Sequence, residues 1–175
     1  MSRREGSEPV PELDPRTHGR EHDQAVANPG LVRPPFVYLA AILSGIGFDL
    51  VRPLRWLPPA AGVWVGVPLV LVALALFIAA TRQFRIARTP VPGNKPATAI
   101  VQSGPYRFSR NPIYLAFSIL VLGIACWINS LWLLGTLGAA VGLMSLVVIP
   151  REERYLERRF DAEYREYKTR VRRWL

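Results

Sequence analysis

Residues 112–153 read PIYLAFSILVLGIACWINSLWLLGTLGAAVGLMSLVVIPREE, and the architecture follows from this stretch. No charged side chain occurs in it before Arg151. Because about 20 helical residues cross roughly 30 Å of hydrocarbon, the stretch holds two membrane spans, at about 112–128 and 131–149. Only a few residues around Asn129 join them. The sequence therefore predicts a tight antiparallel hairpin of two membrane helices.

Two further apolar spans precede this hairpin, at about 35–51 and 60–80. The acidic residues avoid the same region: six of the 13 lie before residue 30, six lie after residue 150, and only Asp49 lies between. A chain whose middle has lost its acidic residues is suited to lipid there. We therefore predict an all-α integral membrane protein with about four transmembrane helices.

The basic residues predict the orientation of these spans. The net charge is +9, and 20 of the 22 Lys and Arg residues lie in 1–33, 81–111 and 150–175, which fall on one side of four spans. The positive-inside rule places this side, with both termini, in the cytoplasm, across the cytoplasmic membrane if the cell is bacterial. Since the charges are divided among loops at the lipid surface, the expected partner is the bilayer rather than nucleic acid.

The N-terminal residues 1–33 are rich in charge, Pro and Gly and are predicted to form a disordered polar tail. Residues 34–175 would then form one membrane domain. The tail has no apolar region like that of a cleaved signal peptide, so the first helix is expected to direct insertion. His18 and His22 are expected to be solvated, and no metal site is predicted. Cys126 is the one cysteine, which excludes an intrachain disulfide.

A proline-rich loop and a C-terminal helix lie on the basic side of the hairpin. Loop 81–111 is long enough to be functional. Pro150 is expected to end the fourth span. Apolar residues at spacings of three and four then predict an amphipathic helix over 151–174. This helix either lies on the bilayer surface or folds over the loop and closes a site, and the two arrangements are compatible.

The motif Arg110-Asn111-Pro112-Ile113-Tyr114 joins the loop to the third span. Asn is a good helix N-cap and Pro suits the first helical position, so an ordinary helix start explains that pair. A helix N-terminus also presents N–H donors to an anion. Arg107 and Arg110 could bind a carboxylate or phosphate there, although positive-inside charge explains them equally well.

Glu152 and Glu153 follow the fourth span directly. Acids in the first turn suit the dipole of the next helix. Neither glutamate, however, has a cationic residue three or four positions further on, because those positions hold Tyr155, Leu156 and Glu157. We therefore expect them to meet a cation elsewhere, either Arg107, Arg110 or a cationic ligand.

These motifs together resemble the isoprenylcysteine carboxyl methyltransferase family, whose core the phospholipid methyltransferases share. The resemblance covers roughly residues 84–174, and its order and spacing are specific. The matching residues are Gly104-Pro105-Tyr106-Arg107, Arg110-Asn111-Pro112-Ile113-Tyr114, Glu152-Glu153-Arg154-Tyr155-Leu156, Phe160 and Tyr164. The chain departs from the family pattern at Asn111, which replaces the histidine of eukaryotic members, and at Asp161, where a glycine is usual.

The resemblance implies a membrane methyltransferase that uses S-adenosylmethionine at the cytosolic face. The residues expected to bind the cofactor are Val101, Gly104, Pro105, Tyr106, Arg107, Asn111, Pro112, Tyr114, Glu152 and Glu153. The residues expected to be catalytic are Arg110, Glu152 and Glu153.

The methyl acceptor is expected to be lipophilic, with a carboxylate as the first candidate. Phospholipid N-methylation is an alternative, and a non-catalytic membrane scaffold is another. Replacing Arg107 is expected to impair methylation most if the acceptor is an anion. Replacing the glutamates by amides is expected to impair methylation most if the acceptor is an amine, because an amine must first lose a proton.

Two features concern helix packing rather than chemistry. Asp49 is expected to pair with Arg52 near the outer end of the first span. Gly62-xxx-Gly66 and Gly138-xxx-Gly142 are small-residue patterns that favour close helix contact, either within the chain or in a homodimer.

Overall fold

The computed structural model describes residues 33–91 and 97–175. The predicted disordered tail, with His18 and His22, lies almost wholly outside these ranges. The described elements are all helical: α2 (Pro34–Val51), α3 (Pro59–Ile86), the 3-10 helix η1 (Gly104–Arg107), α4 (Pro112–Trp127), α5 (Leu131–Leu143), the π-helical turn η2 (Met144–Val148) and α6 (Ile149–Arg170). The predicted all-α fold is confirmed.

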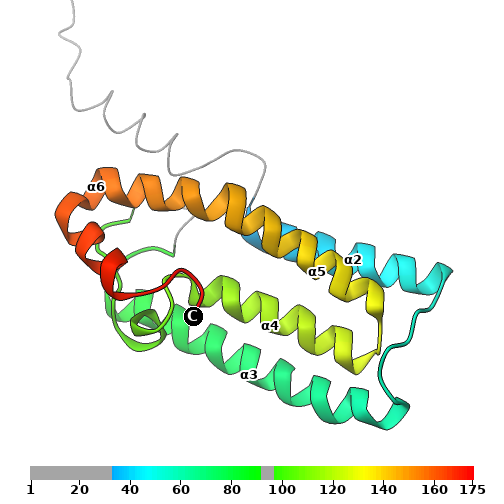
Figure 1. Ribbon diagram of the computed structural model, residues 1–175. Coiled ribbons are helices and arrows are strands. Elements are labelled where there is room, and N and C mark those ends of the chain that lie inside the picture. The colour runs from blue at the N-terminus through cyan, green and yellow to red at the C-terminus, as the bar shows by residue number, and fades with distance from the viewer. Residues whose placement is uncertain (1–32, 92–96) are drawn as a thin grey trace, which may run out of the picture.

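The helices α2, α3, α4 and α5 run side by side along one long axis, as Figure 1 shows. Helix α3 packs on α4, and α2 packs on α5. The chain reverses at one end of the bundle through the connections 52–58 and 128–130. Helix η1, helix α6 and the C-terminus gather at the opposite end, which is therefore the polar end of the molecule (Figure 1).

Within residues 33–91 and 97–175, three helices are long and apolar enough to cross a membrane, as expected of an integral membrane protein. They are Pro34–Val51, Ala60–Ile86 and the continuous helix that begins at Leu131. The second span thus reaches six residues beyond the predicted end at residue 80. Helix α4 is apolar but has 16 residues, which at 1.5 Å per residue is about 24 Å and shorter than the hydrocarbon layer.

Glycines let α3 and α4 approach closely at the end away from the polar elements. A Cβ atom on Gly66 would lie 2.4 Å from the backbone nitrogen of Trp127, and one on Gly62 would lie 2.6 Å from the carbonyl oxygen of Cys126. Backbone atoms cannot move aside as a flexible side chain can. The first small-residue pattern therefore serves packing within the chain, whereas Gly138 and Gly142 have open space around them.

The connection 52–58 is tied to the α4–α5 hairpin through Asn129. Its side chain accepts hydrogen bonds from the backbone N–H groups of Trp56 and Leu57, at 3.1 and 2.9 Å. Asp49 pairs with Arg55 at 3.0 Å, so the predicted partner Arg52 was wrong. Arg55 Nη1 also donates to the carbonyl oxygen of Asn129 at 3.1 Å, so the same group bonds to Asp49 and to the α4–α5 hairpin.

The helix does not end at Pro150, where the fourth span was predicted to end, because it continues from α5 through η2 into α6. The backbone N–H of Ile149 donates to the carbonyl oxygen of Met144, five residues back. This wider π-helical turn directly precedes the proline, so the continuous helix passes Pro150 at a π-bulge. The apolar part still stops there: charged residues begin at Arg151, so the membrane-spanning segment ends at Pro150.

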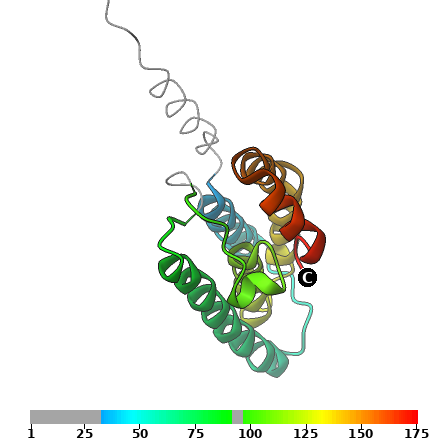
Figure 2. The same ribbon diagram turned by 90° about the vertical axis from the view of Figure 1, so that its left-hand side faces the viewer.

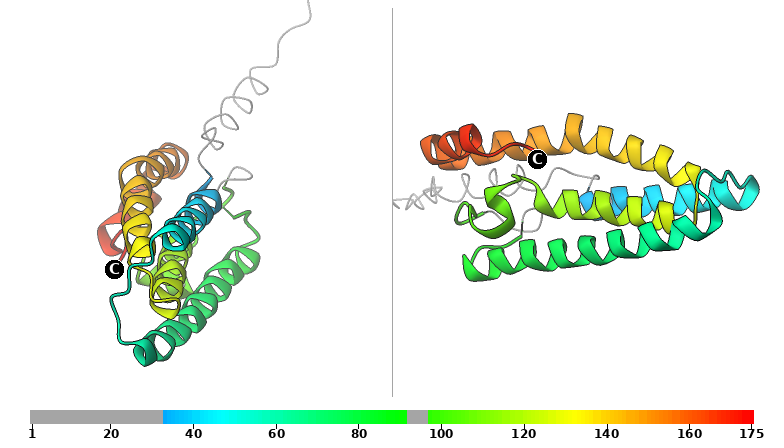
Figure 3. Two further views of the ribbon diagram at one scale, coloured as in Figure 1. Left: turned by 90° about the vertical axis from the view of Figure 1, so that its right-hand side faces the viewer. Right: turned by 60° about the horizontal axis from the view of Figure 1, so that its bottom comes forward.

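The C-terminal helix also differs from the prediction, since it bends at Asp161 and ends at Arg170 rather than at residue 174. Asp161 has φ 42° and ψ −110°, a backbone conformation that only glycine adopts readily. Beyond it the last turns of α6 and the C-terminal residues fold back along the first part of α6, as Figures 2 and 3 show for the red segment. Val171 is extended, with φ −123° and ψ 133°. The bend returns the C-terminus to the start of α4.

Candidate active site

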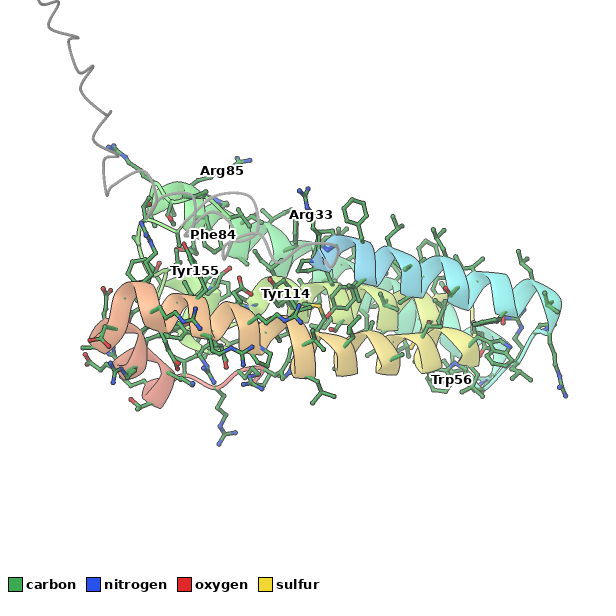
Figure 4. The ribbon with its side chains drawn as sticks, turned by 90° about the horizontal axis from the view of Figure 1, so that it is seen from above. Arg33, Trp56, Phe84, Arg85, Tyr114 and Tyr155 are labelled. Atoms are coloured by element: carbon green, nitrogen blue, oxygen red, sulfur yellow. The ribbon has the colours of Figure 1, made fainter. Side chains whose placement is uncertain are left out.

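A cavity of about 280 Å³ lies at the polar end of the bundle. It is bounded by the start of α2, the last turns of α3, the loop before η1, the start of α4, and α6. Figure 4 shows Phe84, Tyr114 and Tyr155 towards this end, with Trp56 at the opposite end of the molecule. The volume is near the lower limit of typical small-molecule sites, roughly 300–1,000 Å³.

The cavity has an apolar side and a charged side. Rings and aliphatic groups of Phe77, Phe84, Ile113 and Phe117 form the apolar side, at the level of the membrane helices. The charged side holds Arg110, Glu152 and Glu153, with polar groups from Asn111 and Tyr114. An amphipathic ligand could therefore place an apolar part among the helices and a polar part at the loop.

Seven of the eleven residues predicted for the site from sequence line the cavity: Val101, Tyr106, Arg110, Asn111, Tyr114, Glu152 and Glu153. The other four, Gly104, Pro105, Arg107 and Pro112, do not line it. Arg107 is exposed and does not contact the cavity. The Gly104 position supports the loop instead: it has φ 58°, and a Cβ atom there would lie 2.7 Å from the Gln83 side chain.

Glu152 faces the cavity and receives a hydrogen bond from the Tyr114 hydroxyl at 2.9 Å. Tyr114 is itself held, because its carbonyl oxygen accepts a hydrogen bond from the Tyr38 hydroxyl at 3.2 Å. Burial raises the pKa of Glu152 to about 7, against the lowering effect of the Tyr114 hydrogen bond, and the neighbouring Glu153 adds to the rise. Glu152 can therefore gain or lose a proton near neutral pH.

Glu153 is buried, with 6% exposure, and meets two cations. Arg110 Nη1 lies 2.9 Å from its Oε1. Arg173 holds both oxygens, with Nε 3.1 Å from Oε1 and Nη2 2.7 Å from Oε2. The predicted meeting of a glutamate with Arg110 is present, whereas Arg107 takes no part. Arg173 was missed, since in the sequence it is one of nine basic residues after residue 150.

The amide of Asn111 does not cap α4 in the way the sequence suggested. Its Nδ2 donates instead to the carbonyl oxygen of Arg173 at 3.0 Å. The neighbouring Arg110 N–H donates to the carbonyl oxygen of Arg172 at 2.9 Å. The helix start is thus used to bind the C-terminal segment, which the sequence alone could not indicate because both groups come from distant parts of the chain.

Two tyrosines after the Asp161 bend close the cavity from the side of α6. Tyr164 and Tyr167 are buried and line it. The Tyr167 hydroxyl donates to the carbonyl oxygen of Tyr106 at 2.7 Å, which fixes α6 to η1. Burial raises the pKa of Tyr164 to about 12, so it stays neutral at ordinary pH. Of the two predicted arrangements for the C-terminal helix, folding over the loop is therefore present.

Apolar helices that could span a membrane fit an integral membrane protein, and a cavity with one apolar and one charged side at the polar end is its candidate site. A family model described as phospholipid methyltransferase matches residues 61–163, which is more than half of the chain. The protein belongs to the phospholipid methyltransferase family, and that membership supports a membrane methyltransferase.

Two bacterial relatives are similar to parts of the chain. An uncharacterized protein of Haemophilus influenzae is 42% identical over 64 residues, 36% of this chain and 100% of that protein. The cobalt-zinc-cadmium resistance protein CzcN of Cupriavidus metallidurans is 31% identical over 110 residues, 63% of this chain and 50% of that protein. The chain thus spans about half the length of CzcN. No solved structure matches it.

Proposed function

We propose that this protein is an S-adenosylmethionine-dependent methyltransferase that acts on a lipophilic acceptor at the cytosolic face of the membrane. The observation that carries the proposal is the cavity itself. Its apolar side is formed by residues of the apolar helices α3 and α4. Its charged side brings together Arg110, Glu152 and Glu153, from segments about forty residues apart in the sequence. Membership of a methyltransferase family supports the reaction class.

The charged side fits a zwitterionic cofactor. Arg110 Nε is buried and has no hydrogen-bond partner within residues 33–91 and 97–175, so it could donate to a carboxylate. Glu152 faces the cavity with only the Tyr114 hydroxyl bonded to it among the described groups, so its carboxylate could accept from an ammonium group. Arg110, Asn111 and Glu152 would hold the amino-acid part of S-adenosylmethionine, with Tyr106, Tyr164 and Tyr167 beside the rest.

S-adenosylmethionine supplies an already activated methyl group when it is bound. The tasks left to this chain are to align the acceptor and to exclude water. The tyrosines held by the bond from Tyr167 to Tyr106 cover the cavity on the side of α6. The aromatic and aliphatic residues at the level of the helices would receive the apolar part of the acceptor.

The acceptor class remains a carboxylate first and an amine second. A carboxylate needs no base and could be attracted by Arg110, the arginine that lines the cavity. The alternative gives Glu152 a different role: with a pKa of about 7, it would take the proton that an amine must lose instead of holding the ammonium group of the cofactor. Because Arg107 does not line the cavity and Arg110 does, Arg110 is the better arginine to replace in order to distinguish the two acceptors.

The proposal is tested by measuring S-adenosylmethionine binding to the purified protein in detergent. Glu152→Gln is the informative variant, since it removes the unpaired charge with little change in shape. Glu163→Gln is the matched control, because Glu163 is an exposed glutamate of the same helix. We expect saturable binding by the wild type and the control, and binding weakened about 10-fold in Glu152→Gln.

No binding by well-folded wild-type protein would overturn the methyltransferase proposal and favour a non-catalytic scaffold. If binding is found, transfer of a labelled methyl group to membrane lipids identifies the acceptor class. A methyl ester formed on a carboxylate releases volatile methanol in mild base, whereas a methylated amine keeps its label.

A further inference from the structure

The C-terminal segment 171–175 lies across the start of α4 and is fixed there at both sides. Its backbone carbonyl oxygens accept hydrogen bonds from the Arg110 N–H and the Asn111 side chain. Beyond them, the Trp174 indole N–H donates to the Ser145 hydroxyl in the π-helical turn at 3.2 Å. These contacts place the Arg173 side chain beside Glu153, behind the wall of the cavity.

The charges around Glu153 do not balance in pairs. One buried carboxylate is shared by two guanidinium groups, and Arg173 takes the larger part, with one bond to each oxygen. Arg110 contacts a single oxygen through Nη1 and lies on the cavity wall beside the Tyr164 hydroxyl, and its Nε has no hydrogen-bond partner within the described residues. Because Arg173 already offsets the charge of Glu153, the positive charge of Arg110 remains available to the cavity.

We infer that Arg173 is a positioning residue that keeps Arg110 free to bind the anionic end of the ligand, a carboxylate in the case of S-adenosylmethionine. This inference rests on the proposed function. Without Arg173, Glu153 would be left buried with one cation, and Arg110 would be drawn into a full pair with it. The cavity would then keep the negative charge of Glu152 and lose its site for an anion.

A merely structural role for Arg173 predicts something different. If Arg173 only helped to hold the C-terminal segment against α4, its loss would disturb the whole cavity and weaken the binding of every ligand to a similar extent. The electrostatic role predicts a selective loss, confined to ligands that carry an anionic group. The comparison therefore needs two ligands that differ in that group alone.

S-adenosylmethionine and its decarboxylated analogue form such a pair. The experiment measures the dissociation constants of both for the full-length protein in detergent, in the wild type, Arg173→Gln and Arg173→Lys. Arg172→Gln is the control, because the Arg172 side chain is exposed and its bond to Arg110 is made by the backbone oxygen, which the substitution keeps. Thermal unfolding of each variant is followed alongside, so that any loss of fold is seen directly.

We expect Arg173→Gln to raise the dissociation constant of S-adenosylmethionine about 10-fold and that of the decarboxylated analogue less than about 3-fold. Arg173→Lys should recover part of the preference for the carboxylate, and Arg172→Gln should keep all of it. The double variant Glu153→Gln/Arg173→Gln should restore the preference, because Arg110 no longer faces an uncompensated carboxylate.

An equal rise in the dissociation constants of both ligands in Arg173→Gln would overturn the inference and leave Arg173 with a structural role alone. Failure of the double variant to restore the ratio, with its fold intact, would also overturn it. These outcomes differ from failure of the proposed function, in which the wild-type protein binds neither ligand.

Discussion

Glu152 and Glu153 are adjacent in the chain but have opposite surroundings. Glu153 turns towards Arg110 and Arg173 and forms an ion pair with each. Glu152 points into the cavity, where its bonded neighbour is the neutral Tyr114 hydroxyl. Two neighbouring acids on a helix point about 100° apart, which lets one serve the structure while the other stays available to a ligand.

The raised pKa of Glu152 has a consequence for stability. Its folded pKa of about 7 exceeds the ordinary 4.5. The folded state thus binds the proton more tightly, and the stability that this contributes is complete below pH 4.5 and lost as the pH rises to about 7. The loss is on the order of 3 kcal/mol for the ligand-free protein.

Thermal unfolding in detergent between pH 5 and pH 8 measures this effect. We expect Glu152→Gln to reduce the fall in Tm over that interval, because an amide cannot titrate. Glu163→Gln should follow the wild type. Parallel curves for the wild type and Glu152→Gln would show that Glu152 is not the titrating group.

Asp161 is a second residue whose local conformation predicts a measurable change. Its φ of 42° with ψ of −110° suits glycine, the residue usual at this position in the family that the sequence resembles. The ion pair that it makes with Arg165 is exposed and contributes little. Asp161→Gly should therefore raise stability by about 1 kcal/mol, since relief of strain exceeds the entropy that glycine loses on folding.

The measurement is again Tm, and Asp161→Ala supplies the control. Alanine removes the same ion pair but keeps a Cβ atom, so it should not stabilise the protein. Equal effects of glycine and alanine would mean that the charge at this position, and not its backbone conformation, sets the stability.

At the scale of elements, the sequence predicted the helices well and their ends less well. The apolar spans predicted α2, α3, α4 and α5 because lipid requires long apolar helices. Pro150 was taken as a helix end, but a π-helical turn before it allowed the helix to continue. The apolar residues over 151–174 have the spacing of a helix, as predicted. The bend at Asp161, however, depends on the backbone conformation of one residue, which the spacing of apolar residues does not indicate.

Close contact between α3 and α4 gives a prediction about whole elements. Gly66→Ala should destabilise the protein by about 3 kcal/mol or more, because the new methyl group meets backbone atoms of Gly123 and Trp127 within 2.6 Å. Gly138→Ala is the matched control in an apolar helix, since a Cβ atom there has nothing within 4 Å. It should change stability by less than about 1 kcal/mol.

Unfolding of both variants in the same detergent makes the comparison. Similar losses in the two would mean that α3 and α4 are further apart than described. A predicted homodimer through small-residue faces stays a prediction. Of the two glycine patterns, the one on α5 has the open space that a partner helix requires.

At the scale of the molecule, the site brings together residues that lie far apart in the sequence, and this limits what the sequence could predict. Motifs at 101–114 and 152–153 were recognisable because several chemical groups recur at fixed spacing. The roles of Asn111 and Arg173 were not, because each depends on where the folded C-terminal segment comes to lie. Arg107 shows the converse: a basic residue beside a motif need not face the site.

The orientation of the whole molecule is the last prediction. The polar end contains the start of α2, the loop before α4 and the C-terminus, and these segments carry most of the basic residues (Figure 1). Because moving many positive charges across a bilayer is unfavourable, this end should face the cytoplasm. In a Cys126→Ala background expressed in a bacterial inner membrane, Arg52→Cys should react with a membrane-impermeant maleimide in intact spheroplasts, whereas Arg172→Cys should react only after lysis. Both positions are exposed, so a lack of reaction reflects the membrane rather than burial. The reverse pattern would place the cavity, and any cofactor that it binds, on the side of the membrane where S-adenosylmethionine is not made.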